Sequence, residues 1–347
     1  MTLESFDSII KSLDGKKRKK HLLLGNGFSM AYDPKIFSYK ALSRFVDNVE
    51  NEMLKRLFEI IKTKNFEQIM QQLDNFCELA KEFSSDDALE GKLQAANKSL
   101  KTSLLDAITK LHPEHVFKIP TEKSQACAKF LNVFLENDGN VFTTNYDILL
   151  YWVLMRNNDS ISAAIDGFGR ELENPEERMR GEDAEYSELI WGKNRSDQNV
   201  HYLHGALPIF DTGTEIVKEE YDGQNYLLDN IKARIEKKEY PVFVTAGDGQ
   251  EKLRHILHNQ YLTNCYESLC SLDGSLITFG FNFGKYDEHI IDAINIAANQ
   301  GKNFPPKLWS VYIGVYSKDD QKHIEGIKNK FKCKVNMYDA KTANIWE

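Results

Sequence analysis

Two strand ends in the sequence place polar residues where they could act on a nucleotide sugar. Phe142–Asp147 is an apolar strand that runs into an amide and a carboxylate, and Tyr202–Gly205 ends a later strand at a histidine. An amide such as Asn145 can donate to and accept from ribose hydroxyls or a water, and a histidine such as His204 can act as a general base near neutral pH. We therefore expect Asn145 and His204 to be catalytic residues.

Two glycine-containing turns follow other predicted strands. The apolar run Leu22–Leu24 is followed by a turn made by Gly25, Asn26, Gly27, Phe28 and Ser29. A glycine-containing turn of this type lets the backbone approach a pyrophosphate closely. The second turn, Gly280–Gly284, carries Asn282 and could receive a ribose or the adenosine. The first turn lacks the third glycine of the dinucleotide fingerprint, which disfavours a hydride-transfer enzyme.

Each of these motifs also has a structural interpretation. Asp147 could simply cap the helix that begins near Ile148, because Asp is favoured at that position. His204 could be a core histidine with its hydrogen bonds satisfied, and the turns at Gly25 and Gly280 could be ordinary connections between elements. The sequence leaves these alternatives open.

The composition is that of a folded protein with no preference for polyanions. The chain has 347 residues, 41% of them hydrophobic and 28% charged, and a formal net charge of −8. Direct nucleic-acid binding is therefore disfavoured, and the basic run Lys16–Lys20 is interpreted as a solvated turn. No stretch approaches the length of a membrane span. Five dispersed cysteines form no zinc motif and fit a reducing cytoplasm, so no metal is expected.

Hydrophobic periodicity predicts strands that alternate with helices. Apolar residues three and four apart, clearest from Phe66 to Leu79, indicate a helical region. The predicted strands are His21–Leu24, Asn140–Thr144, Val200–Leu203, Pro241–Thr245, Ser275–Phe279, Leu308–Val315 and Cys333–Met337. The other predicted helices are Leu3–Leu13, Glu122–Glu136, Ile148–Arg156, Glu251–Leu269, Asp287–Asn299 and Asp319–Phe331, the last with a capping box from Ser317 and Asp320.

This alternation predicts an α/β fold, a Rossmann-like parallel sheet with helices on both faces. Residues 1–38 and 119–347 would form this domain, residues 39–118 a helical insertion subdomain, and the polar stretch 166–198 a surface loop. Ligands of open α/β sheets bind beyond the carboxyl ends of the strands. Because all four motifs follow predicted strands, we expect them to converge at that edge.

Taken in order, the four motifs resemble the sirtuin-like NAD hydrolases of bacterial antiphage defence, in their zinc-free branch. The resemblance covers about residues 20–315 and includes a helical insertion between the first two motifs. Thr143–Asp147 matches the family's Thr-Thr-Asn-Tyr-Asp motif, Leu203–Gly205 its Leu-His-Gly motif, and Gly280–Asn282 its Gly-x-Ser/Asn element. The resemblance implies that the chain hydrolyses NAD, with Asn145 as a catalytic residue.

The resemblance also implies which residues contact NAD and where the chain departs from the family. The expected contacts are Gly25, Asn26, Gly27, Phe28, Ser29, Asp33, Thr144, Asp147, Gly280 and Asn282. Protein-deacylating sirtuins carry a four-cysteine zinc module and a longer loop, which is replaced here by Met30–Pro34. Both departures argue against acyl-lysine as the substrate.

Unrestrained NAD hydrolysis would harm the cell that makes the enzyme, so the resemblance also implies control in trans. We expect homo-oligomerisation, a separately encoded partner such as an ATPase or a nuclease, or both. Two other classes of protein stay open: a module that binds NAD or ADP-ribose without turnover, and an NAD-dependent protein deacylase.

Overall fold

The structure is a computed structural model in which two sheets account for most of the strands. It describes residues 3–34, 56, 59–60, 66–83, 89, 91–96, 98, 112–113, 115–171, 186–221, 223–244, 248–299 and 308–347. The predicted boundary of the helical insertion at 39 and much of the insertion itself lie outside these ranges, whereas the predicted boundary at 118 falls within the described range 115–171. Within them, no helix has the length and apolar character needed to cross a membrane.

The first sheet is parallel throughout and gives the chain its α/β, Rossmann-like fold. In the described residues its seven strands follow the order β1 (Glu4–Ser5), β12 (Lys334–Asp339), β11 (Leu308–Val315), β10 (Gly274–Phe279), β2 (Lys20–Leu24), β3 (Val141–Thr143) and β6 (Val200–Tyr202). The chain leaves β2 in one direction through β3 and β6, and it returns on the other side through β10, β11 and β12. The strand order therefore switches between β2 and β10, which is where open α/β sheets bind ligands.

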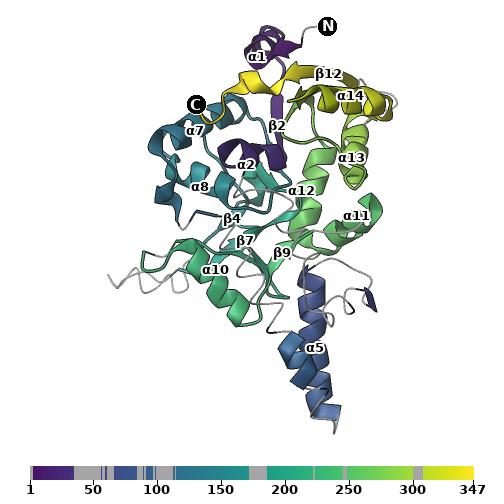
Figure 1. Cartoon of the computed structure of the whole chain (residues 1–347). Coiled ribbons are helices and arrows are strands. Elements are labelled where there is room, and N and C mark those ends of the chain that lie inside the picture. Colours follow the sequence, from purple (N-terminus) through teal and green to yellow (C-terminus); the bar gives the residue numbers. More distant parts are fainter. Residues whose placement is uncertain are drawn as a thin grey trace.

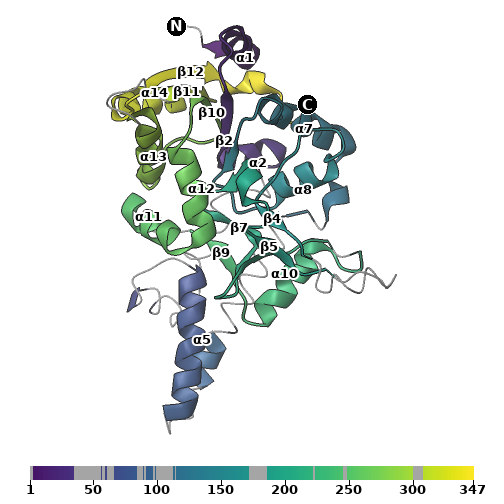
Figure 2. The same ribbon diagram turned by 180° about the vertical axis from the view of Figure 1, so that it is seen from behind.

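Helices cover both faces of this sheet, as Figure 1 and the reverse view in Figure 2 show. On one face, α1 (Phe6–Gly15) lies beside α7 (Thr121–Leu135), with the rings of Phe6 and Phe130 5.3 Å apart. The other face is covered by α12 (Gln260–Cys270), α13 (Glu288–Asn299) and α14 (Lys318–Ile327). Because both faces are covered, the central strands are apolar without alternation, and Leu22–Leu24 of β2 are fully buried.

Local capping signals set several helix boundaries. Ser317 and Asp320 form the predicted capping box at the start of α14. The single helix predicted over Glu251–Leu269 is wrong: α11 (Gly249–His258) ends at Asn259, whose side chain accepts from the amide of Leu262 and caps α12. Asparagine is a preferred N-cap residue, so it divides a run that periodicity alone joins.

The second sheet is antiparallel and was not predicted. Its order within the described residues is β4 (Phe168–Gly169), β5 (Leu189–Trp191), β8 (Ile216–Lys218), β7 (Gly205–Asp211) and β9 (Pro241–Phe243). The strand predicted at Pro241–Thr245 exists in part, but its assignment to the parallel sheet is wrong because β9 pairs antiparallel with β7. The expectation of a surface loop over 166–198 is likewise wrong where β4 and β5 form. Periodicity predicts a strand but not its partner.

The remaining helices lie around the two sheets. Among the described residues they include α2 (Asn26–Tyr32), α5 (Phe66–Phe83), α8 (Leu149–Arg156) and α10 (Leu227–Glu236), and short 3-10 turns occupy Val116–Lys118, Arg195–Asp197, Lys328–Lys330 and Ala340–Ala343. In both views α5 extends away from the body of the molecule (Figure 1, Figure 2). It confirms the helical periodicity found from Phe66 to Leu79.

Candidate functional site

Three side chains from two strand ends form a chain of hydrogen bonds, which we name the amide cluster: Ser29, Asn145 and Asp147. The Nδ2 of Asn145 donates to Ser29 Oγ over 2.9 Å, and this hydroxyl donates to Asp147 Oδ2 over 2.6 Å. Asn145 is 8% exposed, and its backbone amide donates to Thr143 Oγ1. The amide side chain is therefore held at both ends, which fixes the orientation of its carbonyl oxygen.

Asp147 combines a structural and a chemical role. Its Oδ1 accepts a hydrogen bond from the backbone amide of Leu149, the first residue of α8, so Asp147 does help to cap this helix. Burial raises the pKa of Asp147 to about 6, although the hydrogen bonds from Ser29 and Leu149 act in the opposite direction. A carboxyl with such a pKa can gain or lose a proton close to neutral pH.

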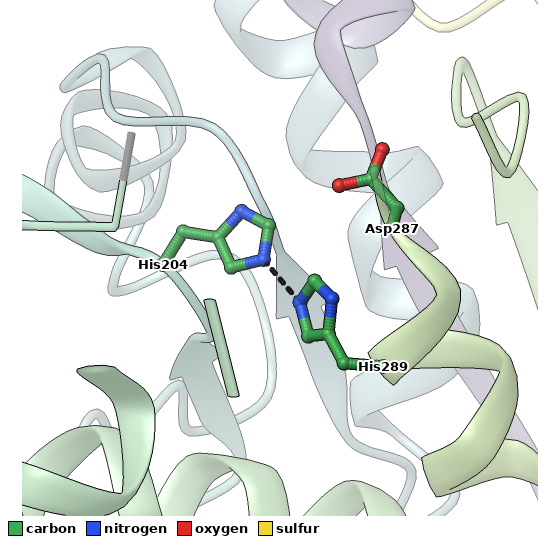
Figure 3. Close-up of side chains that lie close together, drawn as sticks. All are labelled: His204, Asp287 and His289. Atoms are coloured by element: carbon green, nitrogen blue, oxygen red, sulfur yellow. Dashed lines mark hydrogen bonds between the residues drawn. The ribbon is translucent and has the colours of Figure 1, made fainter. Parts of the chain in front are cut away.

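A second group of side chains surrounds His204, and we name it the imidazole cluster: His204, His289, Asp287 and Lys252. Figure 3 shows the Nε2 atoms of His204 and His289 facing each other, and the hydrogen bond between them measures 2.8 Å. Lys252, which is 3% exposed, donates to Asp287 Oδ1 over 2.8 Å. The cluster joins the end of β6 to α11 and to the start of α13.

Both imidazoles are held in the neutral form. Burial first, then electrostatic interactions with His289 and with the charged Lys252, lower the pKa of His204 well below its usual value. Burial and Lys252 lower the pKa of His289 to about 3. A neutral imidazole keeps a lone pair that can accept a proton, so His204 is in the protonation state that a general base requires.

The donor atoms of His204, Asp287 and His289 lie within 4.8 Å of one another, which raises the question of a metal ion. Imidazole and carboxylate suit zinc, but two nitrogens about 2.0–2.1 Å from a tetrahedral ion lie roughly 3.3 Å apart. The observed separation of 2.8 Å is that of a hydrogen bond, and the ammonium of Lys252 already neutralises Asp287. The geometry fits a hydrogen-bonded pair of histidines better than a coordination sphere.

The two clusters lie at the carboxyl ends of neighbouring strands. Thr143 of β3 pairs in register with Tyr202 of β6, and Asn145 and His204 each follow two residues later. The ring of Tyr146 lies between the two segments: its centroid is 6.3 Å from that of His204, and its hydroxyl donates to the carbonyl of Val244. The structure thus brings Asn145 and His204 to one edge of the sheet, as the motif order predicts.

Close packing between backbones accounts for the glycines of the two turns. A Cβ atom on Gly25 would lie 2.6 Å from the carbonyl oxygen of Gly280, and one on Gly27 would lie 2.5 Å from Gly280 Cα. The amides of Gly25, Gly27 and Phe28 donate to the carbonyls of Phe279, Gly280 and Gly25. These three donors are therefore engaged within the protein, and the hydrogen bonding of the turn does not support the predicted pyrophosphate contact through them.

Gly205 has a structural reason to follow His204. Its φ is +77°, and a Cβ atom there would lie 1.9 Å from the carbonyl oxygen of Val242 on β9. A glycine at this point lets the chain pass from β6 of the parallel sheet directly into β7 of the antiparallel sheet. The junction of the two sheets thereby fixes the position of His204.

The other predicted contact residues have structural partners in this conformation. Phe28 is 1% exposed and packs on Trp346, and Thr144 donates from its amide and hydroxyl to the carbonyl of Leu24. Asn282 is exposed and its carbonyl faces His323 Nε2 at 2.9 Å. These residues are placed by packing at the strand ends, and their predicted contacts with NAD stay predictions. The Nδ2 of Asn26 lies 3.0 Å from the sulfur of Met30, and Asp33 caps α2.

A separate recess is lined in part by residues of α8. Aromatic side chains line it, among them Trp152 of α8 and the stacked rings of His115 and Tyr226, which are 4.8 Å apart. The cavity volume of the recess is about 50 Å³. It contains none of the residues that the motifs predict as catalytic or ligand-binding.

The motifs missed three members of the imidazole cluster: His289, Asp287 and Lys252. The signal for His289 was present, because it occupies the first turn of the helix that follows the Gly280 turn. Side chains in that turn lie at the same sheet edge as the strand ends. Ligands of open α/β sheets bind beyond the carboxyl ends of the strands, and applying this principle to the first turn of each following helix as well would have found His289.

The chain belongs to the DUF4917 family, whose model describes a domain of unknown function and matches residues 22–346. The match spans the parallel sheet from β2 to β12 and both clusters. Comparison with curated proteins finds no match.

Proposed function

We propose that the chain is an NAD hydrolase that cleaves the bond between nicotinamide and ribose, giving nicotinamide and ADP-ribose or a cyclised form. The observation that carries the proposal is the position of Asn145 and His204 on neighbouring strands, two residues beyond the paired Thr143 and Tyr202. The order of the motifs, which resembles that of sirtuin-like NAD hydrolases, supports the same activity.

The two clusters divide the chemistry of the proposed reaction. As nicotinamide departs with the electron pair of the glycosidic bond, positive charge develops on the ribose ring. Asn145, held by Ser29, orients the attacking water or ribose hydroxyl, and positioning of this kind contributes several kcal/mol. His204 accepts the proton released by that hydroxyl or water, a step typically worth ~10²–10⁴-fold.

Burial of the site supports control by another chain. Asn145 and His204 are 8% and 3% exposed, so a dinucleotide reaches them only after neighbouring groups move. On α5, Phe76, Leu79 and Phe83 are 43%, 53% and 81% exposed, which supports contact with a second copy or with a separately encoded partner such as an ATPase or a nuclease. Light scattering of the purified protein, with Leu79→Glu as the variant, measures whether α5 joins copies of the chain.

An NAD-depleting effector of antiphage defence is the biological role that the resemblance supports, and the cysteine usage supports a cytoplasmic location. Neither site cluster requires a metal for the proposed step.

Chromatography of the products tests the activity directly. Purified protein incubated with NAD, alone and with candidate partner proteins, should release nicotinamide. Asn145→Ala and His204→Ala should keep their fold and lose turnover by at least ~10²-fold. Full activity in both variants would overturn the site assignment.

The same experiment separates the other two functions. Tight NAD or ADP-ribose binding by calorimetry without any nicotinamide release would identify a non-catalytic sensor. Nicotinamide release that depends on an acylated peptide, together with stoichiometric zinc, would identify a protein deacylase.

A further inference from the structure

His289 stands out among the residues that the motifs leave unassigned. It is 1% exposed, lies 85 residues after His204 in the chain, and places its Nε2 2.8 Å from His204 Nε2 (Figure 3). A hydrogen bond between two imidazole nitrogens requires one to donate and the other to accept. The tautomer of His204 is therefore tied to that of His289.

The groups around His204 determine how well it can carry a positive charge. The groups that face His204 are His289 on α13, Lys252 on α11, Asp287 before α13, and the ring of Tyr146. Asp287 is engaged by Lys252, so no carboxylate stabilises a charged imidazole by direct pairing. His289 is the group that hydrogen-bonds to the ring of His204 and sets its orientation.

We infer that His289 is a positioning residue that holds His204 in the tautomer needed for proton transfer in the proposed NAD cleavage, on which this inference rests. In this tautomer the Nε2–H of His204 donates to His289 Nε2, so the Nδ1 of His204 keeps its lone pair. His289 then carries its own proton on Nδ1, a buried atom with no hydrogen-bond partner among the described residues. The lone pair on His204 Nδ1 accepts the proton from the ribose hydroxyl or water as its oxygen attacks the sugar carbon. The resulting imidazolium of His204 then still donates its Nε2–H to a neutral acceptor.

The arrangement is the one by which a triad carboxylate orients its histidine, with a neutral imidazole in the place of the carboxylate. A neutral acceptor stabilises the imidazolium less than a carboxylate does, so the protonated state of His204 is short-lived. After the bond to nicotinamide breaks, the proton passes from His204 to solvent as the products leave. Lys252 acts in the same direction, because its charge disfavours a second positive charge nearby.

Steady-state kinetics of His289→Ala and His289→Gln test the role of this residue. His289→Ala should lower kcat by ~10–100-fold with KM nearly unchanged, the size of effect seen when the orienting partner of a functional histidine is removed. It should also move the acid limb of the kcat–pH profile to higher pH, because part of the burial that lowers the pKa of His204 is lost with the imidazole ring. His289→Gln, which retains a donor and an acceptor, should recover much of kcat.

His258→Ala is the matched control, since His258 is an exposed histidine on α11 outside the cluster. It should leave kcat, KM and the pH profile at the parental values. Denaturant unfolding of each variant shows whether a loss of kcat reflects loss of fold.

Three outcomes would overturn the inference: parental kinetics in His289→Ala, a change confined to KM, or stoichiometric metal in the parental protein that His289→Ala loses. A parental protein that releases no nicotinamide, either alone or with candidate partner proteins, would overturn the proposed function. Nitrogen-15 NMR of the two histidines then tests the His204–His289 pairing without any need for turnover. The expected spectrum shows one protonated Nε2 within the pair and a changed His204 tautomer in His289→Ala; two independent imidazoles would contradict the pairing.

Discussion

The amide cluster and the imidazole cluster lie at neighbouring strand ends and differ in how they are built. Ser29, Asn145 and Asp147 are joined directly by hydrogen bonds, and two of them come from one six-residue motif. His204 meets its partners from α11 and α13, 48 to 85 residues further along the chain. Every member of the amide cluster lies in a motif that can be recognised in the sequence, whereas His289, Asp287 and Lys252 of the imidazole cluster lie in no such motif.

The clusters also respond to pH in opposite directions, although burial is the main cause in both. Burial disfavours the charged form, so it raises the pKa of Asp147 to about 6 and lowers the pKa of His204 and His289. For Asp147 the folded state binds more protons, so stability falls as pH rises from about 4 to 6. For the histidines the unfolded state binds more protons, so stability falls as pH drops below about 6.5.

The largest expected effect concerns the backbone that holds the imidazole cluster. Gly205→Ala adds a Cβ atom that would lie 1.9 Å from the carbonyl oxygen of Val242, at a φ of +77°. We expect the free energy of unfolding to fall by about 3 kcal/mol or more, from strain and overpacking together. Gly213→Ala is the control: its φ is +87° but nothing lies within 4 Å, so it should cost about 1 kcal/mol. Equal losses in urea unfolding would show that the sheet junction does not fix His204.

Removing the cation of the imidazole cluster should have the next largest effect. Lys252→Met leaves the partly buried Asp287 without its ion pair, which we expect to cost about 3 kcal/mol. It should also raise the pKa of His204 and His289, because the charge of Lys252 lowers both. Unfolding experiments and NMR titration measure the two effects. Lys330→Met breaks an exposed pair with Glu288 and should cost less than about 1 kcal/mol.

The smallest expected effect concerns the pH dependence of stability, in which the two clusters act in opposite directions. Asp147→Asn removes the titrating group of the amide cluster, so the variant should gain stability relative to the parental protein by about 2 kcal/mol between pH 4 and 6 and hold that gain at pH 7. The histidines contribute equally to both proteins, and taking the difference cancels them. A pH-independent difference in unfolding free energy would mean that burial does not raise the pKa of Asp147.

Much of the parallel sheet could be predicted from the sequence, and little of the antiparallel sheet could. Apolar runs such as Leu22–Leu24 predict buried strands because central parallel strands are apolar on both faces. β9 has the same local appearance, yet it belongs to the other sheet because β7 continues directly from β6 through Gly205. The partner of a strand depends on the path of the whole chain.

Within the candidate site, residue types and strand ends placed Asn145, Asp147 and His204 at one edge of the sheet. The same motifs predict that the glycines contact a ligand, and this stays a prediction. The close contacts of Gly25 and Gly27 with Gly280 give these glycines a structural role as well. A local motif does not reveal whether another backbone segment lies so close to a glycine that no Cβ atom would fit.

The sequence by itself determines the order of the apolar runs, the glycines and the polar residues at the strand ends. It does so because the formation of a strand or a turn depends mainly on residues a few positions away in the chain. The contact between His204 and His289, the division into two sheets and the opposite pKa shifts arise only after folding. They depend on which distant segments exclude water from a side chain, and burial of that kind is a property of the packed molecule.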